Sequence, residues 1–154
     1  MIPVELIHPM IVHFPLALFP AAIALDLWIL MRGGDLAARQ PLPQIALATY
    51  VAATLLALLA VILGGFAFDA ALARGFPEAA LEAHEEIAQW SFFIFAGITA
   101  IRLFVYFRRV NMARLRGGAI AFASVAAYAL MLIAAYRGGE LVYQLGVNVA
   151  HAMP

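Results

Sequence analysis

Cysteine and lysine are both absent from this chain of 154 residues. Without cysteine there is no disulfide, iron–sulfur cluster, thiolate-ligated haem or covalently attached c-type haem. Without lysine, Schiff-base chemistry is excluded, and all nine positive charges are arginines. The sequence also has no Ser/His/Asp arrangement, phosphate-binding loop or basic nucleic-acid patch. We therefore expect neither those enzyme classes nor a nucleic-acid partner.

Charge is scarce as well. Charged residues make up 12% of the chain against 66% hydrophobic residues, and the mean hydropathy is +0.98. Soluble domains carry about 25% charged residues, so this chain cannot cover its apolar surface with polar groups. The composition predicts the lipid bilayer as its main partner. No basic segment precedes the first apolar run, so we expect that run to remain as a membrane span.

Four apolar segments are long enough to cross a bilayer. Short connections make sequential helices antiparallel neighbours, which predicts an all-α membrane protein built as an up-down-up-down bundle of four transmembrane helices. We expect one domain over residues 1–154, with no internal repeat. We expect Gly138-Gly139 to end the last helix and leave an interfacial tail, 138–154, on or over the outer end. The four spans are expected at roughly 10–31, 44–68, 84–108 and 117–137.

Arginine is distributed unevenly between the two sets of loops. The loops at 32–43 and 108–116 contain six arginines and a single acid, Asp35, whereas the 69–86 loop and the two chain ends hold most of the acids. The positive-inside rule places arginine-rich loops in the cytoplasm. We therefore expect a bacterial inner-membrane protein with both termini on the periplasmic side.

All four histidines, His8, His13, His84 and His151, are expected at the periplasmic end of the bundle. His13 and His84 fall on the first and third helices, which are diagonal in an up-down bundle and face each other across its core. Imidazoles on opposite sides are common axial ligands of haem iron. We expect His13 and His84 to bind haem b, with His8 and His151 as alternative ligands. A plain interfacial hydrogen-bonding role stays open for each histidine.

A metal ion without a porphyrin is another candidate occupant of this end. Glu82, Glu85 and Glu86 flank His84, and mixed imidazole and carboxylate ligands suit zinc, iron or manganese. The same acids equally fit a solvated acidic face. Both interpretations stay open from the sequence.

Two charges fall inside predicted spans, Asp26 in the first and Arg102 in the third. Both lie at a similar distance from the cytoplasmic end of their helix. A lone charge in hydrocarbon is costly and a paired charge is tolerable, so we predict an intramembrane Asp26–Arg102 ion pair. A clamp between diagonal helices is the simpler role; contact with a quinone, a haem propionate or a proton path is the functional one.

Several short motifs carry a family resemblance. They are His8-Pro9 with Val12-His13-Phe14-Pro15, His84 followed by Trp90, and Gly138-Gly139-Glu140-Leu141-Val142-Tyr143 with Gly146-Val147. With them the chain resembles, over essentially its whole length, the bacterial predicted membrane protein family catalogued as domain-of-unknown-function family 2231. The resemblance implies a four-span membrane domain. Members are sometimes joined to Rieske-type iron–sulfur domains, which hints at electron transfer; a cysteine-free chain needs such a domain as a separate subunit.

The leading hypothesis is a haem b electron-transfer subunit, not a stand-alone enzyme, with its site near the periplasmic face. It would exchange electrons with a periplasmic redox protein, a quinone or other subunits of a membrane complex. One alternative is a cofactor-free structural subunit of a respiratory or photosynthetic complex. The other is a metal-dependent membrane enzyme that uses the outer His/Glu cluster.

Overall fold

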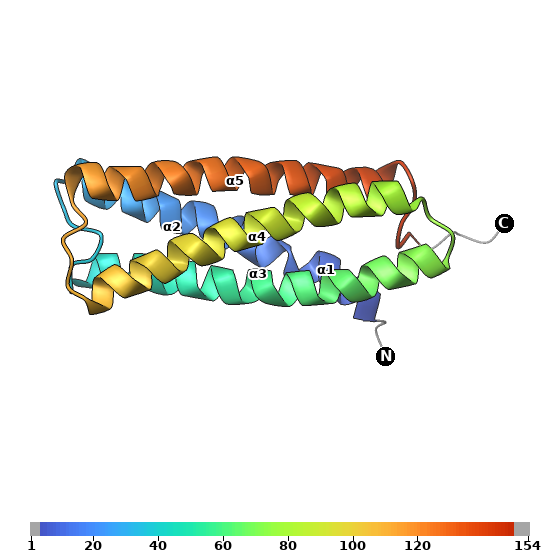
Figure 1. The fold of residues 1–154 in the computed structure, drawn as a ribbon, viewed down its shortest axis with the longest axis horizontal. Coiled ribbons are helices and arrows are strands. Elements are labelled where there is room, and N and C mark those ends of the chain that lie inside the picture. The colour runs from blue at the N-terminus through green and yellow to red at the C-terminus, as the bar shows by residue number, and fades with distance from the viewer. Residues whose placement is uncertain (1–3, 150–154) are drawn as a thin grey trace.

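Five helices make up the computed structural model, which describes residues 4–149 (Figure 1). The first span is formed by two of them in succession, so the helices build the expected all-α, up-down-up-down bundle of four columns. Four segments are long and apolar enough to cross a membrane, Leu6–Met31, Pro41–Ala73, Glu78–Phe107 and Arg114–Tyr143. The helices are α1 (Val4–Ile11), α2 (His13–Met31), α3 (Pro41–Ala73), α4 (Glu78–Phe107) and α5 (Arg114–Tyr143).

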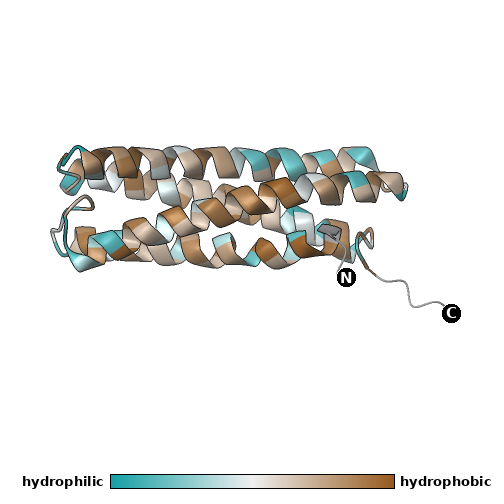
Figure 2. Ribbon diagram, turned by 90° about the horizontal axis from the view of Figure 1, so that it is seen from below, coloured by the Kyte–Doolittle hydropathy of each residue, from teal (hydrophilic) through white to brown (hydrophobic). Residues whose placement is uncertain are grey.

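The columns form a square in which α2 and α4 are diagonal. Each of these two helices packs against both α3 and α5, while α1 packs against α3. Helix α1 begins and helix α5 ends at the same end of the bundle (Figure 1). We call this the histidine end, after His8 and His84, and the opposite one the arginine end, after Arg32 and Arg108. Apolar residues predominate along the helices and hydrophilic residues gather toward the two ends (Figure 2).

Prolines shape the first column. Pro15 has no N–H to offer the Ile11 carbonyl, and the helix is interrupted beside that position, at Val12. Pro20 likewise leaves the Leu16 carbonyl without its helix donor, yet α2 continues through it. The hydroxyl of Tyr128 on α5 donates to the Leu16 carbonyl at 2.9 Å. A neighbouring helix thus satisfies the backbone group that proline exposes, as an apolar environment requires.

The glycine pair of the last span does not end its helix, contrary to the expectation for 138–154. Helix α5 runs through Gly138-Gly139 to Tyr143, because a glycine inside a helix costs only about 1 kcal/mol relative to alanine. The described residues after Tyr143 turn back, and Val147 is buried against Ala71 and Leu81. This part of the tail therefore caps the histidine end.

The two halves of the chain are built alike, so the expectation of no internal repeat is wrong. Helices α2 and α4 end in the same backbone hydrogen-bond pattern. The Gly33 N–H donates to the Leu30 carbonyl after α2, and the Arg109 N–H donates to the Tyr106 carbonyl after α4. Further along, Val51-Ala52-Ala53 and Gly64-Gly65 of α3 recur as Val125-Ala126-Ala127 and Gly138-Gly139 of α5. The bundle is a pair of similar helical hairpins that run in the same direction.

Equivalent residues of the two hairpins meet in the core. Three pairs, each 76 residues apart in sequence, face each other: His8 with His84, Phe19 with Phe95, and Asp26 with Arg102. The Phe19 and Phe95 rings stack with their centroids 3.7 Å apart. A residue can touch its own equivalent only beside an axis that relates the two copies. An approximate two-fold axis therefore runs along the centre of the bundle.

Candidate functional site: a tethered histidine pair

His8 on α1 and His84 on α4 face each other at the histidine end. Their ring centroids are 6.4 Å apart and the ring planes are inclined by 77°. His8 Nδ1 lies 2.8 Å from the carbonyl oxygen of Ala60, and His84 Nδ1 lies 3.0 Å from that of Ala134. A carbonyl oxygen only accepts hydrogen bonds, so Nδ1 must carry the hydrogen in both rings. In the neutral imidazoles, each Nε2 then keeps a free lone pair.

Two glycines make room for these rings. Gly64 and Gly138 each follow the accepting carbonyl by one helical turn. A β-carbon at Gly64 would lie 3.2 Å from His8 Cε1, and one at Gly138 would lie 3.0 Å from His84 Cε1. Both distances are tighter than ordinary van der Waals contact, so glycine lets each ring approach the helix that holds it.

The pair lines a cavity of about 490 Å³ whose wall comes from all five helices, with only the first residues of α2 taking part, and from the tail after α5. Its size falls in the range of sites for small molecules and cofactors. Small and apolar residues form most of its wall, among them Ala57, Ala67 and Phe92. Helix α1 packs against α3 but not against α5, and residues of both α1 and α5 line the cavity.

His13 lies elsewhere than the sequence argument placed it. Its side chain is exposed, and its Nδ1 hydrogen-bonds the Pro9 carbonyl one turn earlier. Residues five positions apart point about 140° away from each other on a helix, so His8 and His13 face different directions although both border the cavity. His8, expected only as an alternative ligand, is the histidine that faces His84. The fourth histidine, His151, lies outside the described residues.

The acids around His84 do not gather with it. Glu82 and Glu86 are exposed, and Glu85 at the cavity wall accepts a hydrogen bond from Gln89 at 3.0 Å. Among residues 6–149, whose side chains are described, no three His, Asp or Glu side chains converge as a metal-binding group. The exposed positions of Glu82 and Glu86 fit a solvated acidic face.

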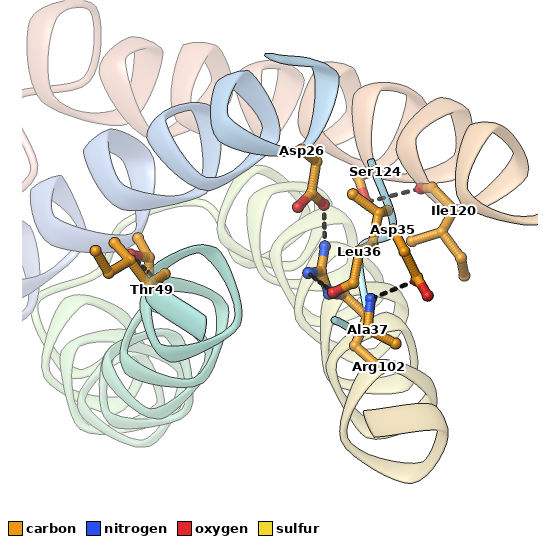
Figure 3. Close-up of polar contacts among 9 residues, drawn as sticks. Asp26, Asp35, Leu36, Ala37, Thr49, Arg102, Ile120 and Ser124 are labelled. Atoms are coloured by element: carbon orange, nitrogen blue, oxygen red, sulfur yellow. Dashed lines mark hydrogen bonds and ion pairs between the residues drawn. The ribbon is translucent and has the colours of Figure 1, made fainter. Parts of the chain in front are cut away.

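Asp26 and Arg102 form an ion pair between α2 and α4 (Figure 3). The side chain of Asp26 is 0% exposed and that of Arg102 is 3% exposed. Arg102 also reaches the Leu36 carbonyl at 3.5 Å, and its Cζ lies 4.7 Å from the centre of the Tyr50 ring. The pair lies about 27 Å from His8 along the bundle, by the rise of an α-helix. It is therefore remote from any ligand of the histidine pair.

Comparison with known proteins identifies the family. Residues 5–151 match the family model described as Predicted membrane protein (DUF2231). The chain belongs to this family. No curated protein and no solved structure matches the chain. The description of DUF2231 gives the membrane and no activity, so the chemistry of this DUF2231 protein is argued from its own residues.

Sequence reasoning missed four residues of the histidine site. Ala60 and Ala134 supply the carbonyl oxygens that accept from the histidines. Gly64 and Gly138 leave room for the two rings. Each looks ordinary by itself in an apolar helix. The signal that reveals them is the repeat, because His8 precedes Gly64 much as His84 precedes Gly138. Only the comparison of the two halves shows that these residues belong together.

Proposed function

We propose that this DUF2231 protein binds a haem b between His8 and His84 and serves as an electron-transfer subunit rather than a stand-alone catalyst. The observation that carries the proposal is the pair of imidazoles whose Nδ1 hydrogens are tied to helix carbonyls. A histidine that binds a metal almost always donates its other ring N–H to a carbonyl or carboxylate, which fixes the tautomer and the ring orientation. Both rings already have that arrangement.

The separation of the rings supports the same proposal. Two imidazoles on opposite sides of one metal have centroids about 6 Å apart, since each metal–nitrogen bond is about 2 Å and each nitrogen is about 1 Å from its ring centre. The observed separation is 6.4 Å. The cavity walls are apolar, as the covering of a porphyrin requires. A chain without cysteine is restricted to non-covalent haem.

His8 and His84 would hold the haem, and the haem would supply one-electron transfer between a reduced redox protein and an oxidised acceptor in the membrane, such as a quinone. No bond is made or broken. We place the arginine end in the cytoplasm by the positive-inside rule. The histidine end then faces the periplasm of a bacterial inner membrane, where a separate redox subunit would dock.

Absorption spectroscopy of the purified protein tests the proposal. A reduced-minus-oxidised spectrum should show the α-band of a b-type haem, and His8→Ala and His84→Ala should each lose it. His13→Ala tests the alternative ligand: the His13 side chain is exposed and bonded to its own helix, so this variant should keep the band. Purified folded protein that stays colourless after incubation with haem would overturn the proposal and favour a cofactor-free accessory subunit.

A further inference from the structure

The two halves of the histidine site are copies of each other. In each, a histidine Nδ1 donates to an alanine carbonyl, and a glycine one turn further on leaves room for the ring. The two hydrogen bonds measure 2.8 and 3.0 Å, and the two glycine clearances measure 3.2 and 3.0 Å. The approximate two-fold axis between the hairpins therefore passes between the two imidazoles, which would be equivalent ligands of a metal held there.

Neither ring is free to swing away. Each imidazole is held by its hydrogen bond on one atom and by the helix surface beside its glycine. A catalytic metal site keeps one coordination position open, whereas a site with all positions filled by the protein does not. Equivalent tethering on both sides therefore argues against a ligand that leaves during the reaction.

Among the described residues of the cavity wall, His8 and His84 are the histidines whose rings face each other across the site. His13 is exposed, and the carboxylate of Glu85 accepts a hydrogen bond from Gln89. Toward the arginine end, the stacked and fully buried rings of Phe19 and Phe95 fill the core between α2 and α4. The site thus offers two imidazoles on its axis and apolar walls around them.

We infer that His8 and His84 would together hold a bound haem from both sides and leave no open position on its iron, with their ring planes close to perpendicular, as the 77° between the rings indicates. This inference rests on the proposed function and narrows it. A closed haem exchanges electrons and does not bind oxygen, carbon monoxide or other small ligands. The site would then belong to an electron carrier and not to an oxidase or a gas sensor.

Two measurements on the haem-loaded wild-type protein test the inference. Low-temperature electron paramagnetic resonance of the ferric form should show the highly anisotropic low-spin signal of perpendicular imidazoles. The spectrum of the ferrous form should not change under carbon monoxide. A high-spin ferric signal or a carbon monoxide adduct would overturn the closed site, and the rhombic signal of parallel imidazoles would overturn the perpendicular arrangement. In either case haem binding itself would still stand, whereas a protein without haem sinks the proposed function instead.

Gly138→Ala provides a matched perturbation of one ligand. The added β-carbon would lie 3.0 Å from His84 Cε1, whereas no atom comes closer than 4.0 Å to a β-carbon at Gly139. Gly138→Ala should shift the low-spin signal or admit carbon monoxide, and Gly139→Ala should behave as wild type. Identical spectra for wild type and Gly138→Ala would show that helix contact does not hold the His84 ring in place.

Discussion

Replacing Arg102 by leucine is expected to destabilise the bundle more than any other change at the buried ion pair. The Arg102 guanidinium is the donor to Asp26 Oδ2, and Asp26 Oδ1 has no hydrogen-bond partner in the described chain. Arg102→Leu therefore leaves a fully buried carboxylate unpaired. The unpaired carboxylate is expected to bind a proton and become neutral. Protonating an aspartate at pH 7 costs about 4 kcal/mol of free energy, given its ordinary pKa. This matches the loss of about 3–5 kcal/mol expected when one partner of a buried pair is removed.

Asp26→Leu should cost less than Arg102→Leu. The guanidinium that remains keeps the Leu36 carbonyl and the face of the Tyr50 ring, and a desolvated cation–π contact contributes about 2 kcal/mol. The double variant should come close to wild type, because leucines in place of a buried ion pair are often neutral or stabilising. The expected order of free energies lost is Arg102→Leu first, then Asp26→Leu, then the double variant.

The free energy of unfolding of the four proteins in bicelles, completed as a double-mutant cycle, measures this order. Equal losses for Arg102→Leu and the double variant would refute the argument that an unpaired carboxylate is the source of the cost. A larger loss for Asp26→Leu than for Arg102→Leu would refute the role given to the Tyr50 ring.

Two further outcomes follow from the fold. Tyr128→Phe should lower the free energy of unfolding by about 1 kcal/mol, the size of an interhelical hydrogen bond in a membrane protein, because it leaves the Leu16 carbonyl unpaired. Tyr136→Phe, at a side chain that is 66% exposed, is the control and should change it little; equal effects would refute the proline-compensation argument. Since the chain has no cysteine, single-cysteine variants report topology cleanly. A membrane-impermeant maleimide should label Ala79→Cys in intact spheroplasts and Gln40→Cys only after the membrane is opened; the reverse pattern would invert the orientation.

The fold was predictable from the sequence because hydropathy and span length together leave few alternatives for an apolar chain. Four spans joined by short loops can pack only as antiparallel neighbours, and the structure has this arrangement. The ends of the helices were less predictable. Gly138-Gly139 resembles a helix stop when it is considered alone, but its small size serves a contact with His84 that the sequence does not display.

The candidate site was predictable in depth but not in direction. Position along a helix follows from counting residues, so the sequence placed His8 and His84 at the same end and Asp26 level with Arg102. The direction in which a side chain points depends on where the first helix starts and bends. The prolines around Val12 leave the start and the bend of the first helix undefined in the sequence. Position along the helix was then the remaining criterion, and it favoured His13, which lies further into the bundle than His8.

The repeat escaped notice for a different physical reason. Lipid-facing and core positions of a membrane helix accept many apolar residues, so two halves under the same constraint retain few identities. The most informative equivalent pair, Asp26 and Arg102, has opposite charges and is not recognised as a match by residue type. Contact between equivalent residues in space is what shows the relationship.

That opposite charge has a consequence for how the hairpins choose their partner. In a symmetric assembly of two identical hairpins, an aspartate on the axis would meet another aspartate, and an arginine another arginine, and both contacts repel within hydrocarbon. Only the pairing of the hairpin that carries Asp26 with the hairpin that carries Arg102 leaves no net charge beside the axis. The ion pair therefore discriminates the correct half from a second copy of the same half, and it disfavours the pairing of two identical halves from different chains during assembly.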